Sequence, residues 1–449
     1  MMNHTITKGI GLLAALTLSV GALGACGSTQ SADGGKTAAG KVFFLNFKPE
    51  AADQWKAIAE EYTKETGVKV DVQTAASNTY EQTLKSEMAK SQAPTLFQVN
   101  GPVGLASWKS YTADMSKSEV YRQLTNQDLA LKSDDGQQVL GVPYAMETYG
   151  LIYNKDIMGK YMKLSDAKVK SVKEINSFDK LKAVADGIQQ HKDELGVKGA
   201  FTSAGFDSSS DWRFKTHLAN IPLYYELKED KITTQPESVK GTYLPQFKQI
   251  FDLYLKDSTT DPKQLSSKTG DDANSEFALG EAALYQNGTW AWTDLEKAGM
   301  SKDQIGMMPI YIGAPGEKDQ GLATGSENYW CINKKASKDD QRATEKFLAW
   351  MITSEKGKKA MSSDMGFTTP FKSFDDVKSD NPLVEEAVED SKSGKTQVSW
   401  NFTMMPSEQW KNDLGNALLE YAQGTGNWDK VKSAFVDNWA KEYQANRQA

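Results

Sequence analysis

The chain has 449 residues, with 52 Lys and Arg against 59 Asp and Glu, which gives a formal net charge of −7 at pH 7. A negative chain is poorly matched to nucleic-acid phosphates and to anionic membrane surfaces, so we expect neither as a partner. With three histidines and two cysteines, a metal site or a Ser-His-Asp triad has few residues to draw on, and no metal or cofactor is predicted.

The first residues have the pattern of an export signal. Lys8 precedes an apolar run, residues 10–23, that is short and rich in Gly and Ala, and we therefore expect residues 1–25 to be a signal peptide. Residues 23–26, Leu-Gly-Ala-Cys, resemble a bacterial lipobox, in which the cysteine is acylated. The resemblance predicts a lipid on Cys26; the alternative is an ordinary signal peptide cut nearby.

Residues 26–40 are small and polar and show no apolar period, which predicts a flexible tether. Folded sequence is expected to begin at Lys41. Once Cys26 is acylated, Cys331 has no partner for an intramolecular disulfide, and its apolar neighbours indicate a buried thiol.

Residues 41–100 alternate between strand and helix patterns. Apolar or alternating runs predict strands over 41–47, 68–72 and 95–99, and apolar stripes predict a helix on each connection. This order implies right-handed crossovers and a mainly parallel sheet, in which ligands bind beyond the carboxyl ends of the strands. Asn46, Phe47, Lys48 and Asn100 lie at those ends.

The rest of the chain predicts an α/β protein with two substantial lobes and no internal repeat. Residues 133–136 read as a hairpin turn. Helical patterns dominate residues 174–300, and a long amphipathic helix is predicted over 338–362. Extended segments are predicted over 141–156, 305–313 and 328–333, and the chain ends in helices over about 407–423 and 427–445.

Three segments together resemble one family, the carbohydrate-binding proteins of ABC importers of the maltose-binding type. GVPYAMETYGLIYNKD (141–156) resembles their first crossing between lobes. FALGEAALYQNGTWAW (277–292) resembles their helix and strand ending in a sugar-stacking Trp. SENYWCINKKASKDDQRATEKFLAWM (326–351) resembles their third crossing and the helix after it. With the lipobox, the resemblance spans nearly the whole chain.

The resemblance implies a type II periplasmic-binding-protein-like fold, with two α/β lobes, three hinge crossings and a ligand cleft between the lobes. The first lobe is then expected over 41–146 plus 311–335, and the second over 147–310 plus 336–449. It also implies a monomeric, non-enzymatic receptor that binds an oligosaccharide and hands it to the permease subunits of an ABC importer. Its expected location is the outer face of a Gram-positive cell membrane.

A sugar site needs aromatic planes for the C–H faces of the rings and charged or amide groups for the hydroxyls. Trp290 follows Asn287-Gly288, a dipeptide typical of turns, and matches the family's stacking position; Trp292 is expected to pack inside. Glu147 is an acid within an apolar run and is expected to bind hydroxyls, with Tyr149 on the same face.

The other candidate site residues end strands or lie in loops and crossings. They are Phe47, Lys48, Asn100, Asp207, Trp212, Glu327, Trp330 and Trp400. For the tryptophans the alternative is burial in a lobe core or under a loop, and for Glu147 it is a hinge carboxylate that binds backbone amides.

Two other functional classes stay open from the sequence. A glycoside hydrolase needs two carboxylates at a defined separation, and the many acids of the chain allow such a pair. A ferric-iron importer component uses neighbouring tyrosines, which Tyr224 and Tyr225 would supply, and a polyamine-binding relative would need acids around aromatic rings.

Overall fold

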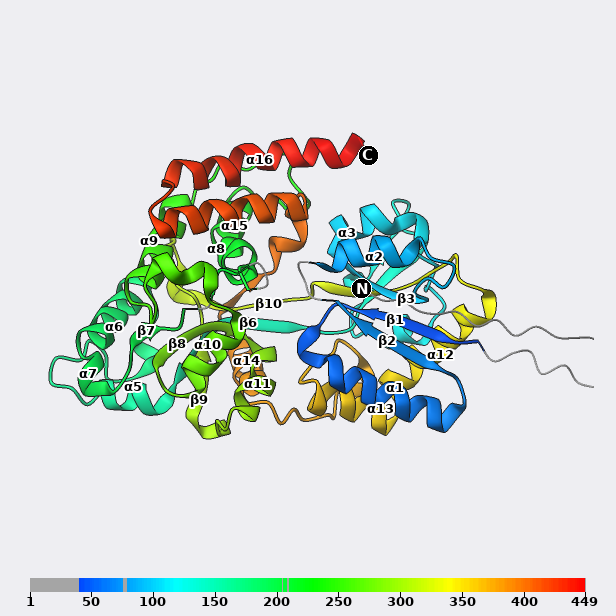
Figure 1. The fold of residues 1–449 in the computed structure, drawn as a ribbon, viewed down its shortest axis with the longest axis horizontal. Coiled ribbons are helices and arrows are strands. Elements are labelled where there is room, and N and C mark those ends of the chain that lie inside the picture. The colour runs from blue at the N-terminus through cyan, green and yellow to red at the C-terminus, as the bar shows by residue number, and fades with distance from the viewer. Residues whose placement is uncertain (1–39, 76–78, 204, 208–209, 449) are drawn as a thin grey trace, which may run out of the picture. The chain divides into compact units, whose positions relative to one another are not determined.

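The structure is a computed structural model that describes residues 40–75, 79–203, 205–207 and 210–448. Cys26, the signal peptide and the tether lie outside these residues. Within them, two six-stranded mixed sheets form, each covered by helices (Figure 1). No helix in the described ranges has the length and apolar composition needed to cross a membrane.

The N-terminal lobe is built on the first sheet. Strands β1, β2 and β3 run parallel, as their alternation with helices predicts, whereas β11 runs antiparallel to both β3 and β5. The strand order is β2 (Val70–Thr74), β1 (Val42–Asn46), β3 (Leu96–Asn100), β11 (Asn328–Ile332), β5 (Val139–Pro143) and β4 (Leu131–Lys132). Strands β4 and β5 form the predicted hairpin.

Helices cover both faces of this sheet. Helix α1 buries the stripe that its sequence predicts, Trp55, Ile58, Ala59 and Tyr62, and ends at Gly67 with a φ of 73°. Helices α1 and α12 share one apolar cluster with the sheet, and α2 and α3 share another on the opposite face (Figure 1). The helices are α1 (Ala52–Thr66), α2 (Tyr80–Met88), α3 (Gly101–Trp108), α4 (Glu119–Gln123), α12 (Lys338–Thr353) and α13 (Glu355–Lys359), with the π-helix η11 (Ala360–Asp364) and the short turns η1 (Pro49–Ala51), η3 (Lys109–Tyr111), η4 (Gln127–Leu129) and η12 (Lys372–Phe374).

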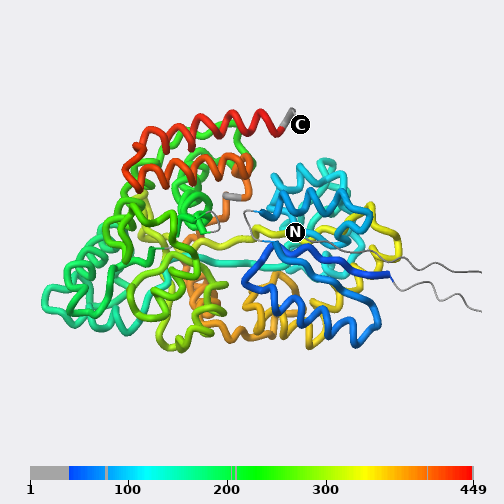
Figure 2. Tube along the Cα trace, viewed as in Figure 1, coloured from blue at the N-terminus to red at the C-terminus, as the bar shows by residue number. Residues whose placement is uncertain are grey.

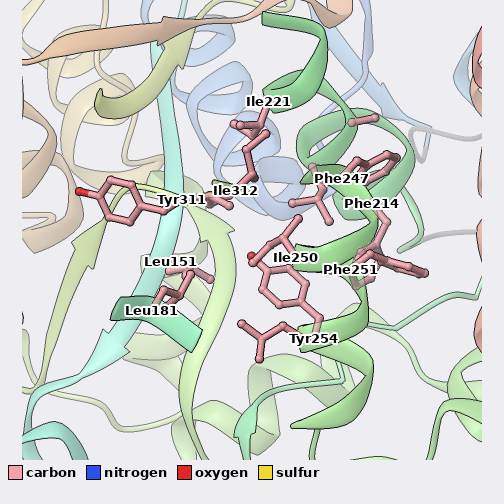
Figure 3. Close-up of a cluster of buried hydrophobic side chains, with 14 of the residues drawn as sticks. Leu151, Leu181, Phe214, Ile221, Phe247, Ile250, Phe251, Tyr254, Tyr311 and Ile312 are labelled. Atoms are coloured by element: carbon pink, nitrogen blue, oxygen red, sulfur yellow. The ribbon is translucent and has the colours of Figure 1, made fainter. Parts of the chain in front are cut away.

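The C-terminal lobe is built on the second sheet. Its order is β12 (Thr396–Ser399), β10 (Gln320–Gly325), β6 (Glu147–Asn154), β8 (Ala282–Gly288) and β7 (Gly199–Phe201), with β9 (Ile305–Met308) also paired to β6. Its largest apolar cluster joins this sheet to α6, α8, α9, α15 and α16. Figure 3 shows part of it, with Phe247, Ile250, Phe251 and Tyr254 projecting from α9 beside Ile312.

The helices of this lobe are α5 (Lys155–Tyr161), α6 (Phe178–Gln190), α7 (Lys192–Leu195), α8 (Ala219–Glu229), α9 (Leu244–Lys256), α10 (Gly270–Ala278), α11 (Trp292–Lys297), α14 (Pro382–Lys392), α15 (Glu408–Gln423) and α16 (Trp428–Gln448). Shorter turns are η5 (Val172–Glu174), the π-helix η6 (Arg213–Leu218), η7 (Pro262–Ser267), η8 (Thr289–Ala291), η9 (Lys302–Gln304), η10 (Glu317–Asp319) and η13 (Asn401–Met404).

The chain passes between the two sheets three times (Figure 2). The first crossing joins β5 to β6 and the second joins β10 to β11. The third leaves η12, whose Phe374 packs in the N-terminal lobe, and enters α14, whose Leu383 packs in the C-terminal lobe. The predicted two-lobed α/β fold with three crossings is therefore confirmed.

Two of the expected lobe assignments are wrong. Residues 336–374 were expected in the second lobe, but Phe347, Leu348 and Met351 of α12 belong to the N-terminal apolar cluster. Conversely, residues 311–325 were expected in the first lobe, but Tyr311 and Ile312 belong to the C-terminal cluster. The segment around Asn328 is accordingly the second crossing of the three. The lobe of α12 could not be predicted, because an amphipathic stripe shows that a helix covers a sheet but not which sheet it covers.

Candidate functional site

Five aromatic rings from separate parts of the sequence gather at the inner end of the C-terminal lobe. Tyr149 lies on β6, Trp212 immediately precedes η6, Trp290 lies in η8, and Trp400 follows β12. His217 of η6 lies among them, with ring centres 4.5 Å from Tyr149, 4.8 Å from Trp212, 5.4 Å from Trp290 and 5.7 Å from Trp400. We call these five residues the aromatic cluster.

Four members of the aromatic cluster are candidate site residues from the sequence, but His217 is not among those candidates. A regular α-helix places residues five apart on different sides, so Trp212 and His217 do not read as neighbours. The π-helical turn of η6 bonds residue i to residue i+5 and places the two rings together. Burial lowers the pKa of His217 well below 6.5, and nearby Arg213 lowers it further, so the imidazole is neutral at pH 7.

The exposed faces of the aromatic cluster belong to Trp212 and Trp290, which are half-buried and 5.9 Å apart between ring centres. Trp400 and Tyr149 are buried, at 6% and 0% exposure. Trp212 is backed by the buried Arg213, whose guanidinium carbon lies 4.2 Å from the indole centre. This contact supports one face of the Trp212 indole.

Trp290 folds back over the end of its own strand. Asn287 and Gly288 were expected to turn, but they are the last residues of β8, and Gly288 is extended, with φ −125° and ψ −172°. A Cβ at position 288 would lie 2.2 Å from Cη2 of Trp290, so any other residue there would displace the indole from this position. Trp292 packs inside the lobe, as predicted, at 5% exposure.

An ion pair joins the N-terminal lobe to the first crossing. Lys48, two residues beyond β1, donates to both carboxylate oxygens of Glu147, at 2.7 and 2.9 Å. Both side chains are buried, at 8% and 5% exposure, and Glu50 lies 3.6 Å from the ammonium group. Burial alone would lower the pKa of Lys48, but the carboxylates of Glu147 and Glu50 raise it above its usual value.

A second group of charges lies where α15 meets the N-terminal lobe. Lys411 bonds to Glu408 at 2.7 Å. Burial acts to raise the pKa of Glu408, but this ion pair lowers it below its usual value, and the Asn100 side chain at the end of β3 also lowers it. Burial raises the pKa of Glu327, in the second crossing, to about 7, although Lys411 and Lys48 act in the opposite direction. Both groups of charges therefore lie near the boundary between the lobes, one at the first crossing and one where α15 contacts the N-terminal lobe.

The other candidates are placed as follows. Phe47 is half-buried and packs its ring edge-on against Tyr80, with centres 5.3 Å apart. Asp207 is half-buried in the loop after β7, where its amide bonds to the Lys268 carbonyl at 3.3 Å. The hydroxyl of Tyr149 donates to the His217 carbonyl at 2.8 Å.

The expectation that Trp330 contacts ligand is wrong for this structure. Trp330 is fully buried and stacks on Tyr144, with ring centres 4.6 Å apart and planes inclined by 9°. It also packs against Trp55 and Phe371 in the core of the N-terminal lobe. Strand β11 is covered on both faces, so its apolar side chains on either side enter a core.

The features expected for an iron site do not come together. Tyr224 and Tyr225 are both 7% exposed within the C-terminal core, and the hydroxyl of Tyr225 donates to Oε1 of Gln320 at 2.6 Å. The described residues contain no group of three His, Cys, Asp or Glu side chains arranged to hold a metal ion. Cys331 is buried, as predicted, and burial raises the pKa of its thiol.

Two lobes joined by three crossings, with aromatic rings and charges where they meet, define a binding protein of the two-lobed receptor class. The chain belongs to the family of bacterial extracellular solute-binding proteins, whose family model matches residues 57–389.

Solved structures share the fold. RafE in complex with raffinose has a TM-score of 0.69 at 18% identity, covering 90% of this chain and 99% of that chain. A chitin oligosaccharide binding protein has a TM-score of 0.70 at 15% identity, covering 91% of this chain and 98% of that one. A sugar transporter from Bacillus licheniformis in complex with stachyose has a TM-score of 0.67 at 18% identity, covering 89% and 100%.

Proposed function

We propose that this protein is the lipid-anchored substrate-binding component of a bacterial ABC importer, and that it captures a di- or oligosaccharide and delivers it to the membrane permease. The observation that carries the proposal is the aromatic cluster, in which Trp212 and Trp290 keep indole surface exposed beside the crossings. Indole planes fit the C–H faces of sugar rings, so partly exposed indoles beside the crossings suit a sugar site.

Family membership and the ligands of similar folds support the same class of solute. The family consists of extracellular solute-binding proteins, and two of the structures with this fold hold raffinose and stachyose. The charged side chains near the crossings, Lys48, Glu147 and Glu327, supply the charge-assisted bonds that sugar hydroxyls need. In this proposal the sugar contacts both lobes and shifts the population toward a closed state.

The proposal includes no chemical step on the sugar. Glu147, the acid predicted to lie at the site, has its two oxygens bonded to Lys48, which does not suit a general acid that must carry a proton. Incubation with oligosaccharides, followed by chromatography, is expected to return them unchanged. Hydrolysis products would favour a glycoside hydrolase instead.

A calorimetric screen of the purified protein against neutral di-, tri- and tetrasaccharides tests the proposed function. We expect saturable binding of at least one oligosaccharide, and weaker binding of its component monosaccharides. Absence of binding across the panel, with binding of ferric iron or a polyamine instead, would contradict the proposal. Mass spectrometry of the membrane-bound form tests the proposed anchor, because acylation adds its mass at Cys26.

A further inference from the structure

The second crossing carries a buried amide without hydrogen bonds. Asn328, the first residue of β11, is 3% exposed, and neither its Nδ2 nor its Oδ1 has a partner among the residues that the structure describes. Two residues earlier, the Oγ of Ser326 is also buried and likewise unpartnered within the described chain. Three polar atoms on two residues of this short segment are therefore withdrawn from water without a hydrogen bond to the described protein.

At the other end of the same strand, a second buried asparagine has hydrogen-bond partners for its side chain. Asn333 follows β11 directly and is 1% exposed. Its Nδ2 donates to the Pro94 carbonyl at 2.8 Å, and its Oδ1 accepts from the Lys335 amide at 2.9 Å. Asn333 therefore stabilises the fold, whereas Asn328 is buried at a cost that its own surroundings do not offset.

Buried polar groups in native proteins are bonded in the great majority of cases, and an exception calls for a specific explanation. An amide with both its donor and its acceptor unpaired pays the desolvation cost of two groups. The cost of an unpaired amide is explained if the amide gains a hydrogen-bond partner when the protein functions. A ligand bound between the lobes is such a partner.

The neighbours of Asn328 place it at the candidate site. Its register partner across the sheet is Asn100, the last residue of β3. Gly325, three residues earlier, pairs with Glu147, and a Cβ on Gly325 would lie 2.6 Å from Cβ of Trp400. The crossing thus runs from the aromatic cluster to the mouth of the N-terminal sheet.

We propose that Asn328, together with Ser326, binds the saccharide directly and sets its specificity. The inference rests on the proposed function and names residues of the N-terminal side of the site. One amide offers a donor and an acceptor side by side, so it bonds two neighbouring hydroxyls only when their relative orientation matches. A sugar of the wrong configuration leaves the amide unpaired, which penalises it.

Two matched substitutions test this assignment with opposite expectations. Asn328→Leu keeps the branching and the number of heavy atoms of the side chain and removes two unpaired polar groups, so the ligand-free protein should melt at the same or a higher temperature than wild type. Its saccharide affinity should fall at least about tenfold, because two hydrogen bonds are lost. Asn333→Leu should lower the melting temperature and leave affinity within about twofold of wild type.

Calorimetric titration measures the affinity of both variants for the best oligosaccharide from the screen and for an epimer of it. Thermal denaturation measures the stability of the ligand-free variants. The preference of wild type for the better epimer should shrink toward unity in Asn328→Leu and should persist in Asn333→Leu. Wild-type affinity in Asn328→Leu would overturn the inference, as would a loss of thermal stability like that of Asn333→Leu. Failure of wild type to bind any saccharide would overturn the proposed function itself, which is a distinct outcome.

Discussion

Removing either partner of the Lys48–Glu147 ion pair should strongly destabilise the protein. The ammonium group contacts both carboxylate oxygens, and the two side chains are only 8% and 5% exposed. In such a setting, loss of one partner leaves a buried charge without compensation. We therefore expect Lys48→Met to cost about 3–5 kcal/mol in the free energy of unfolding at pH 8.

The structure also predicts that the two single substitutions are unequal. When Glu147 is replaced by Gln, Lys48 keeps Glu50 at 3.6 Å as a second acidic neighbour. When Lys48 is replaced by Met, the described residues offer no other cation that bonds to Glu147. Glu147→Gln should therefore cost less than Lys48→Met. The double variant Lys48→Met/Glu147→Leu should cost less than Lys48→Met alone, because no buried charge is left.

Urea unfolding followed by tryptophan fluorescence at pH 5 and pH 8 measures these differences. Burial raises the pKa of Glu147 above 4.5 although Lys48 acts in the opposite direction, so the folded-state pKa of Glu147 rises further when Lys48 is removed. A carboxyl with a raised folded-state pKa loses its stabilising contribution as pH rises, so the deficit of Lys48→Met should be smaller at pH 5. Single-variant costs below about 1 kcal/mol that add in the double variant would refute the reasoning, because they would mean that the pair is solvated.

Three further predictions concern the site and the contact between lobes. Trp290→Ala should weaken saccharide binding by about 1–3 kcal/mol in calorimetry, by analogy with other aromatic stacking contacts, and unchanged affinity with an intact fold would remove Trp290 from the site. Glu327→Gln should stabilise the protein increasingly from pH 5 to pH 8, because the folded-state pKa of Glu327 is raised from 4.5 to about 7. The full shift is worth about 3 kcal/mol, and partial exposure reduces the expected gain to about 1–2; a gain independent of pH in urea unfolding would contradict it. Gly101→Ala should destabilise the protein more than Gly67→Ala in thermal denaturation. Both glycines have a positive φ, but only at position 101 would a Cβ lie 2.7 Å from Thr403 of the other lobe. Equal losses of stability would show that this contact is absent in solution.

Local sequence patterns predict the helices and strands of the fold but not how these elements pack together. The apolar stripe of Trp55, Ile58, Ala59 and Tyr62 predicts α1 because a 3.6-residue period leaves no other explanation. The same periodicity in α12 is equally compatible with either sheet, so its lobe was assigned wrongly. Which surface a helix covers depends on long-range topology that a single segment does not contain.

The candidate site divides in the same way. Trp290 and Trp400 could be singled out because the family resemblance implies stacking residues at these positions, and Trp212 because it lies beside a loop, where function concentrates. The pairing of Lys48 with Glu147 spans 99 residues and has no local signal. The unpaired amide of Asn328 is invisible in sequence, because asparagine at a strand end is ordinary and only its surroundings make it costly.

A crystal structure of the protein with the oligosaccharide selected by calorimetry tests the central claim most directly. The account predicts an unmodified sugar between the two lobes, with one ring stacked on the indole of Trp290 and hydroxyls bonded to the amide of Asn328. A sugar bound elsewhere on the surface, with Trp290 covered by protein, would contradict it.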